Sequence, residues 1–263
     1  MSSSASFEVL VAEILNFLYN DGEISAEVKA VVAQYAENEY FGKPCGLLDQ
    51  TAISLGGLKM LDFSDKNKIG VTEINNALSD YSLVLIDTGG SHANLTDEYA
   101  SIPREMFSVA NAMGKDRLIE LDKNEFFELL PNVVNQLSDR AVLRAIHFYE
   151  ENDRVDLACN ALLIDDYETF LTAVKDSGIS SLNKLQNCYV SGSVEQPIPK
   201  ALSISNGYLC GGVNRVHGGG FAGSILNIVK NDNLSAFING MSKYYSLNDI
   251  IPLRVRTVGA ITL

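Results

Sequence analysis

The apolar residues near the start of the chain recur at helical spacing. Large apolar side chains lie three or four positions apart, which predicts an amphipathic helix. These residues are Phe7, Leu10, Val11, Ile14, Leu15 and Leu18. The serines that precede Phe7 can cap the first turn of this helix. Asn20-Asp21-Gly22 breaks the pattern.

A second helix is predicted after this break, with Ser25 as its candidate cap and with Glu37 near its end. Its apolar stripe consists of Val28, Val31, Val32 and Tyr35.

Further along, strand-like and helical segments alternate irregularly. Continuous or alternating apolar runs predict strands at residues 58–63, 81–89, 224–229 and 253–263. Helical periodicity covers residues 47–57, 95–113, parts of 116–131 and 133–149, two helices within 153–178, and 234–241. This order predicts a layered α+β fold. The polar stretch at residues 64–76 is a candidate domain boundary.

Composition and charge narrow the function classes. The 263 residues are 46% apolar, which is typical of a soluble globular protein. The net charge of −13 argues against general nucleic-acid binding, which requires a basic face. No apolar run approaches the roughly 18 residues that span a membrane, and no secretory signal is visible. The four cysteines and three histidines are scattered, so reduced thiols, no structural zinc site and a cytoplasmic protein are expected.

The serine-rich segment SSSAS, residues 2–6, lies at the start of the first predicted helix. The N–H groups of a first helical turn have no internal partner, and the helix dipole places partial positive charge there. A phosphate could therefore bind, and a serine hydroxyl could bind the Mg²⁺ ion that such a phosphate holds. From this segment alone, a disordered tail or a simple helix cap is the favoured interpretation.

The segment FGKPCGLLDQ, residues 41–50, combines a tight loop with an acidic residue. Gly42, Pro44 and Gly46 constrain the loop, and Asp49 follows among apolar neighbours. A carboxylate that is partly removed from water is a natural acceptor for a hydroxyl proton. A capping aspartate on a short helix is the alternative.

A third segment, VNRVHGGGFAGS, is glycine-rich and precedes a predicted strand. Its glycines Gly218, Gly219 and Gly220 can adopt positive φ and bring the backbone against a ligand. The segment is not a G-x-G-x-x-G followed by a helix, so it does not indicate a Rossmann site. A flexible turn and a ligand-facing loop both remain open.

Together and in this order, the three segments resemble motifs of the GHMP kinase superfamily, most closely those of the galactokinases. SSSASFEVLVA resembles the end of the phosphate-loop motif, and AEN-x-x-FGKPCGLLDQ resembles A-E-x-x-F-x-G-x-P-C-G-x-M-D-Q. VNRVHGGGFAGS resembles the third motif, R-M-T-G-G-G-F-G-G, with Val216, His217 and Ala222 in place of Met, Thr and Gly.

The resemblance implies a role for each matched residue in phosphorylating D-galactose at its anomeric hydroxyl with ATP. Asp49 would be the base near that hydroxyl, and the Gly46 backbone and Tyr99 would contact the sugar. Ser4 and Glu37 would bind Mg²⁺. The remaining matched residues would contact the ATP phosphates: Ser2, Ser3, Gly218, Gly219 and Gly220. Tyr99 is followed only by Arg104 and Met106, where the family often has several arginines and a cysteine.

The resemblance also implies two α+β domains, one at residues 1–75 and a ferredoxin-like one at residues 76–263. Galactokinases have a substantial segment before the serine motif, so we expect a C-terminal portion with a remnant first domain and little activity alone. Such a remnant would expose apolar faces and self-associate. Two alternatives remain: a related kinase acting on N-acetylgalactosamine, and a non-catalytic galactokinase-like sensor that binds sugar and nucleotide.

Overall fold

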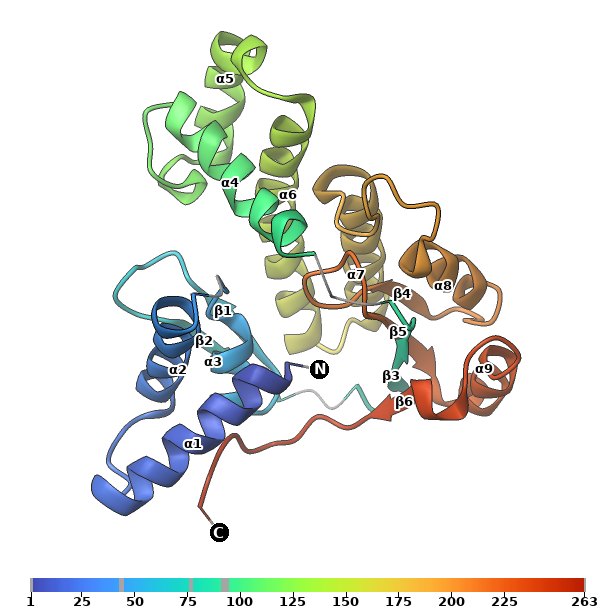
Figure 1. The fold of residues 1–263 in the computed structure, drawn as a ribbon. Coiled ribbons are helices and arrows are strands. Elements are labelled where there is room, and N and C mark those ends of the chain that lie inside the picture. Colours follow the sequence, from blue (N-terminus) through green and yellow to red (C-terminus); the bar gives the residue numbers. More distant parts are fainter. Residues whose placement is uncertain (1, 43–44, 76–77, 91–94, 263) are drawn as a thin grey trace. The chain divides into compact units, whose positions relative to one another are not determined.

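The structure, a computed structural model, describes residues 2–42, 45–75, 78–90 and 95–262 (Figure 1). The chain forms two compact units, one from Met1–Asn75 and Arg254–Leu263 and the other from Asn76–Leu253. The sequence analysis assigned the last segment to the second domain, whereas the structure groups it with the first unit.

The first unit begins with the two helices that the sequence predicts. Helix α1 spans Ser3–Tyr19, and helix α2 spans Ala26–Tyr35. The predicted cap of α2 is confirmed, because Ser25 Oγ accepts a hydrogen bond from the Val28 N–H (3.4 Å). Helix α2 runs into a π-helical turn, Ala36–Tyr40. Helix α3 (Leu48–Leu55) ends at Gly56, as predicted.

The apolar stripes of α1 and α2 are not the faces that these helices bury. Phe7 is 67% exposed, and the other predicted stripe residues are exposed as well. The buried positions are mostly small residues, which let two helices approach closely; they are Ala5, Val9, Asn16, Lys29, Ala30 and Ala33. Lys29 is compensated by an ion pair with Glu13. Helical periodicity alone therefore gave the correct elements but the incorrect buried face.

The first unit also contains an antiparallel hairpin of β1 (Lys59–Asp62) and β2 (Gly70–Glu73). Strand β1 was predicted, but β2 lies in the polar stretch that we interpreted as a domain boundary. A strand with an exposed face needs few apolar residues, and Val71 is accordingly exposed.

The end of the chain is not the strand predicted at residues 253–263. Only Ile250–Leu253 forms a strand, β6. The following residues lie along the first unit, where the Gly57 N–H donates to the Arg256 carbonyl oxygen (2.7 Å). Gly56 has φ of 64°, and a Cβ there would overlap the backbone of Val258. The alternating pattern therefore belongs to an extended segment that packs without a strand partner.

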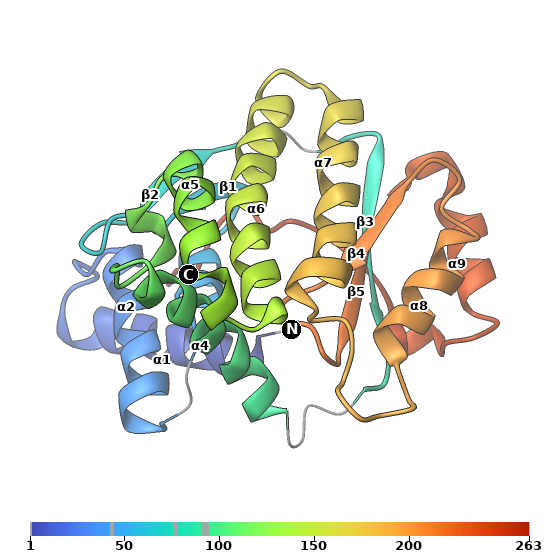
Figure 2. The ribbon, with the colours of Figure 1, turned by 90° about the horizontal axis from the view of Figure 1, so that it is seen from above.

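The second unit contains an antiparallel four-stranded sheet with the order β4-β5-β3-β6. The strands are β3 (Tyr81–Asp87), β4 (Val213–Val216), β5 (Ser224–Lys230) and β6. Strands β3 and β5 were predicted, whereas β4 was taken as part of a glycine-rich turn. Helices α8 (Pro197–Asn206) and α9 (Leu234–Met241) cover one face of this sheet (Figure 2). Their apolar side chains form the main core with those of β3 and β5.

Four longer helices precede α8. They are α4 (Thr96–Ala112), α5 (Lys123–Val133), α6 (Asp139–Leu163) and α7 (Tyr167–Ser180). Helices α4, α5 and α6 share a second core around Val109, Phe126 and Ala145. Helix α7 packs beside α6 and β4 (Figure 2). It continues into a π-helical turn, Ser181–Leu185.

A buried histidine lies where α6 packs against α7. His147 Nδ1 is 2.9 Å from Ser180 Oγ, and burial lowers the pKa of His147 to about 4. The Glu151 carboxylate opposes this shift, whereas the Arg154 and Arg215 guanidinium groups add to it. His147 is therefore neutral at pH 7 in the folded protein.

We expect this histidine to make the folded protein less stable as the pH falls from about 6.5 to about 4. The unfolded histidine binds its proton near 6.5 and the folded one only near 4, so the unfolded state holds more protons between these values. Urea unfolding at pH 7 and pH 5 measures the effect. His147→Gln should reduce the difference between the two pH values. An equal pH dependence in this variant and in the parent would contradict the assignment.

Candidate functional site

A hydroxyl from the start of α1 bonds to the carboxylate at the start of α3. Ser2 Oγ donates a hydrogen bond to Asp49 Oδ2 (2.6 Å). Ser2 precedes α1 with left-handed φ and ψ of 40° and 46°, and its side chain makes no capping hydrogen bond. The predicted serine cap is therefore wrong at Ser2. Its hydroxyl bonds Asp49, 47 residues further along the chain.

Asp49 lies in the first turn of α3 and is exposed to solvent. The expectation that its carboxylate is partly removed from water is therefore wrong. The positive end of the helix dipole favours a carboxylate at this position. An exposed carboxylate in this place can accept a proton from a hydroxyl group of a bound molecule.

A second hydroxyl–carboxylate pair forms two residues further along the chain, in the first turn of α1. Ser4 Oγ donates to Glu37 Oε1 (2.9 Å), and Gln50 Nε2 donates to Glu37 Oε2 (3.0 Å). Glu37 is only 4% exposed, so it is not a solvated residue at a helix end. The carboxylate lies on the π-helical turn that follows α2, a feature that is frequent at functional sites.

Hydrogen bonds hold the backbone of the segment that leads into α3. The Cys45 N–H donates to Asn38 Oδ1 (2.7 Å), and Asn38 Nδ2 donates to the Cys45 carbonyl (3.2 Å). Burial and the nearby Glu37 carboxylate raise the pKa of the Cys45 thiol to about 11, so this thiol stays neutral. Gly46 follows with open space around its Cα. Pro44 lies outside the described residues.

Gln50 was not predicted as a site residue, although it follows Asp49 at the end of the motif FGKPCGLLDQ. Its side chain is buried, and besides Glu37 it contacts the Cys45 sulfur (3.6 Å). Gln50 therefore fixes the orientation of the Glu37 carboxylate from α3. The signal available in the sequence was a glutamine directly after the motif aspartate.

In the second unit, the glycine-rich loop is held by an aromatic residue of α4. Tyr99 Oη donates to the Gly220 carbonyl oxygen (2.9 Å), and its ring packs edge-on against Phe221 with 5.3 Å between centroids. A Cβ at Gly219 would lie 2.7 Å from the Tyr99 ring, so only glycine fits there. The structure thus brings Tyr99 together with two of the predicted loop glycines.

Asn187, which lies in the segment after the π-helical turn Ser181–Leu185, also holds this loop. No motif in the sequence marks Asn187. Its carbonyl oxygen accepts a hydrogen bond from the Phe221 N–H, and its Nδ2 donates to the Gly219 carbonyl (3.2 Å). Gly220 has φ of 82°, and a Cβ there would overlap Asn187. The positive φ expected of this loop is therefore confirmed at Gly220.

Two further predicted residues, Ser3 and Gly218, are described but form no side-chain hydrogen bond with the site residues named above. Ser3 is the first residue of α1 and is exposed. Gly218 is exposed, with φ of 65° and open space around its Cα. Both leave backbone groups accessible to a ligand.

None of the described helices is long and apolar enough to cross a membrane. The described residues contain no cluster of three or more histidine, cysteine, aspartate or glutamate side chains suited to a metal ion. All four cysteines are described, and each is a free thiol in this structure.

The start of the chain matches a known family. Residues 1–57 match the model of the GHMP kinases N terminal domain. In overall fold the chain is similar to the L. major mevalonate kinase in complex with R-mevalonate, with a TM-score of 0.62 at 17% identity. That match covers 98% of this chain and 66% of the other. The start of the chain is thus similar to the N-terminal domain of the GHMP kinases, and its fold is similar to that of a mevalonate kinase.

Several curated relatives of the chain are galactokinases. The galactokinase of Levilactobacillus brevis is 32% identical over 93% of this chain and 62% of the relative. That of Clostridium tetani is 28% identical over 94% of this chain and 62% of the relative. The structure of Lactococcus lactis galactokinase complexed with galactose has a TM-score of 0.80 at 24% identity, and the match covers 98% of this chain and 66% of that one. The chain is thus a galactokinase relative that spans 62% of the length of these curated proteins.

Proposed function

We propose that the protein to which these residues belong transfers the γ-phosphoryl group of ATP to the anomeric hydroxyl of D-galactose. The observation that carries the proposal is the double pairing of serine hydroxyls with carboxylates, Ser2 with Asp49 and Ser4 with Glu37. The proposal also draws on the galactokinase relatives. It is made for the whole protein, since the chain spans 62% of the relatives' length.

Asp49 would act on the sugar. The anomeric oxygen attacks the γ-phosphorus, the bond from that phosphorus to the bridging oxygen breaks, and ADP leaves. The hydroxyl proton passes to the Asp49 carboxylate. Phosphoryl transfer depends mainly on alignment and charge neutralisation, and a positioned base adds acceptance of the hydroxyl proton. The exposure of Asp49 and its bond from Ser2 support this role, since the carboxylate is accessible and oriented.

The Gly46 backbone and Tyr99 would contact the sugar, and Ser2, Ser3 and the loop glycines 218–220 would contact the phosphates. The accessible backbone at Ser3, Gly46 and Gly218 supports these roles.

Ser4 and Glu37 would hold Mg²⁺. Magnesium takes octahedral oxygen ligands at about 2.0–2.1 Å, so adjacent ligands lie about 2.9 Å apart. Ser4 Oγ and Glu37 Oε1 are 2.9 Å apart, and these residues therefore fit two neighbouring positions around one ion. When bound, the ion would neutralise phosphate charge.

For the second unit we propose a ferredoxin-like core. Its strands and helices follow the order β-α-β-β-α-β, if α4–α8 count as one helical crossover. The sheet order, read from β6, is fourth, first, third and second strand of the unit, with antiparallel neighbours.

The reaction is tested by incubating the whole protein, for which it is proposed, with ATP, Mg²⁺ and single sugars and following the products by ³¹P NMR. We expect galactose 1-phosphate and ADP in equal amounts. A clear preference for N-acetylgalactosamine would replace the proposed substrate. Binding of galactose and ATP without turnover would favour a sensor and overturn the proposal.

We expect Glu37→Gln to raise the Mg²⁺ concentration for half-maximal activity by at least about tenfold, because an anionic ligand is lost. Titrating activity with MgCl₂ at fixed ATP measures this change. Glu39→Gln is a matched control, because Glu39 lies exposed on the same turn. Equal Mg²⁺ dependence in both variants would contradict the ligand role of Glu37.

We also propose that the chain self-associates through the first unit. A groove of about 670 Å³ between α1, α2 and the π-helical turn is lined mainly by apolar side chains, including Phe7, Val11, Leu15, Val32 and Phe41. Contiguous exposed apolar surface of this kind favours association.

Sedimentation velocity across a concentration series measures this self-association. Leu15→Glu should shift the protein toward monomer, whereas Val194→Glu, at a fully exposed position of the second unit, should not. A parent chain that stays monomeric at every concentration would contradict the proposal.

A further inference from the structure

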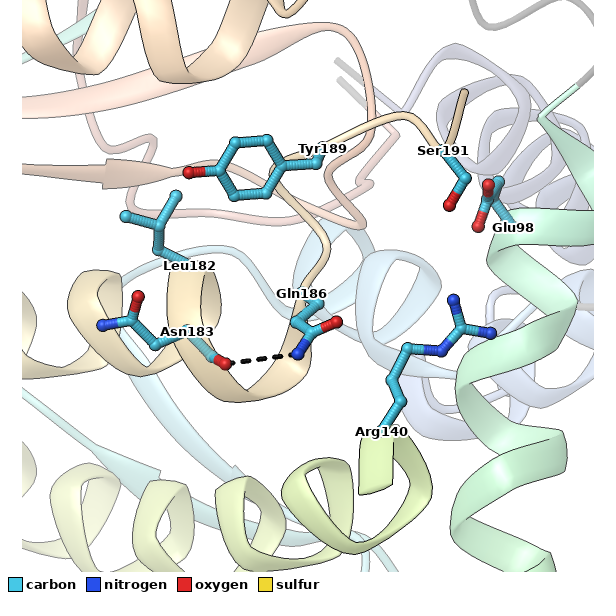
Figure 3. A pocket seen from close by; sticks show the side chains of 7 residues that line it. All are labelled: Glu98, Arg140, Leu182, Asn183, Gln186, Tyr189 and Ser191. Atoms are coloured by element: carbon cyan, nitrogen blue, oxygen red, sulfur yellow. Dashed lines mark hydrogen bonds between the residues drawn. The ribbon is translucent and has the colours of Figure 1, made fainter. Parts of the chain in front are cut away.

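A polar pocket in the second unit shares no residue with the site proposed above. It has a volume of about 290 Å³, near the lower end of the range of about 300–1,000 Å³ for small-molecule sites. Its walls come from α4, the start of α6, the π-helical turn after α7 and the segment that follows (Figure 3). We propose that this pocket binds a neutral saccharide.

The side chains that line the pocket have the chemistry that a sugar ring requires. In Figure 3 the Tyr189 ring lies over Leu182 on one side of the hollow, and Arg140, Ser191 and Glu98 lie on the other. An aromatic ring beside an aliphatic side chain suits the C–H face of a sugar ring. Amide, carboxylate, hydroxyl and guanidinium groups supply both donors and acceptors, which is what sugar hydroxyls require.

The charged groups around the pocket balance one another, which favours a neutral ligand. The Arg140 guanidinium forms a bidentate ion pair with Glu105, with Nη2 2.5 Å from Oε1, and the Glu98 carboxylate lies nearby as a second negative charge. Arg144 pairs with the same Glu105, so two positive and two negative charges leave no net positive field that would select an anion such as phosphate. A neutral ligand with many hydroxyl groups matches this balance better than an ion does.

Several polar groups of the pocket are not engaged in hydrogen bonds that stabilise the fold. Among the described residues, the side chains of Asn183, Tyr189, Ser191 and Glu98 make no hydrogen bond, and Arg140 Nη1 makes none either. Their hydrogen-bonding capacity is therefore available to a ligand. A sugar that met these groups would replace water rather than break bonds of the fold.

The backbone of the pocket has the features of a constrained site. Its floor is the π-helical turn Ser181–Leu185, and Gln186 follows with left-handed φ and ψ of 56° and 43°.

The pocket adjoins the residues that hold the glycine-rich loop. Gln186 precedes Asn187, and Glu98 precedes Tyr99; both of these neighbours bond to the loop. A bound saccharide would therefore contact the two segments that position residues 219–221. Occupancy should be visible at the loop as well as in the pocket.

Saturation-transfer NMR with D-glucose, D-galactose and maltose as separate probes tests the inference on the intact protein. We expect at least one probe to give a signal that falls at least fivefold in Asn183→Ala and in Tyr189→Ala. Asn239→Ala is the matched control, an exposed asparagine on α9 of the same unit, and it should keep the signal. A loss of signal in the two pocket variants while Asn239→Ala keeps it separates this pocket from the proposed kinase site, whose residues are unchanged in all three variants.

The inference is overturned if no probe gives a signal, or if the signal is the same in the pocket variants as in the parent. It is also overturned if inorganic phosphate displaces the sugar by binding to the same residues. Because Asn183 is exposed, its variant decides the outcome even if Tyr189→Ala loses its fold.

Discussion

Replacing Asp49 by Asn is expected to lower kcat for galactose phosphorylation by about 10²- to 10⁴-fold, the usual contribution of a positioned general base. The amide has the size of the carboxylate but cannot take the hydroxyl proton. Its oxygen can still accept the hydrogen bond from Ser2, so the local geometry should survive. Asp49 is exposed, and thermal unfolding should therefore be nearly unchanged. Steady-state rates at saturating ATP and galactose measure the loss.

Asp21→Asn provides the matched control. Asp21 is an exposed aspartate of the same unit, and asparagine tolerates its left-handed backbone, with φ of 50°. Its kcat should equal that of the parent. A full loss of kcat with an unchanged KM for galactose would fit a role in the chemical step alone. An Asp49→Asn variant that kept kcat within about threefold would exclude Asp49 as a catalytic base.

The sequence identified the residues of the first unit's site but not how they pair. Asp49 and Glu37 were found through their motifs, yet each bonds to a serine far away in the chain, over 47 and 33 residues. Such pairs depend on how α1 packs against α2 and α3. Local spacing carries no information about that packing.

The differences in the fold have a related cause. Helical periodicity predicted α1 and α2 correctly, but the buried residues are the small ones, because close helix approach selected Ala30 and Ala33 rather than the large apolar stripe. Strand β2 and the segment after Leu253 were misassigned because their own sequence patterns do not define them. A strand with one partner is defined by the strand that it pairs with, and an extended segment by the surface on which it packs.

The second unit shows the same limit at Asn187. The glycines of the loop were visible in the sequence, and their positive φ follows from the absence of a side chain. The residue that fixes the loop by two hydrogen bonds lies 32 positions before Gly219, in a segment without a motif. Only the sheet and helix arrangement of this unit brings the two segments together.

Replacing Arg144 by Met is expected to cost the second unit about 3–5 kcal/mol of unfolding free energy, the usual effect of breaking a buried ion pair from one side. The Arg144 side chain is fully buried. Its Nε donates to the Leu185 carbonyl (2.9 Å), and its Nη1 donates to Ser101 Oγ and to Glu105 Oε2, each at 2.9 Å. Methionine fills much of the volume but leaves these acceptors without their donor.

Arg140→Met is the matched control, because both arginines lie on α6 and pair with the same carboxylate of Glu105. Arg140 is 37% exposed, and an exposed ion pair contributes only about 0–1 kcal/mol. Urea unfolding followed by circular dichroism should therefore separate the two variants by at least about 2 kcal/mol. Equal losses would mean that burial does not set the strength of this network. Arg144 joins α4, which carries Tyr99, to the turn before Asn187, so its loss should also loosen the glycine-rich loop that both residues hold.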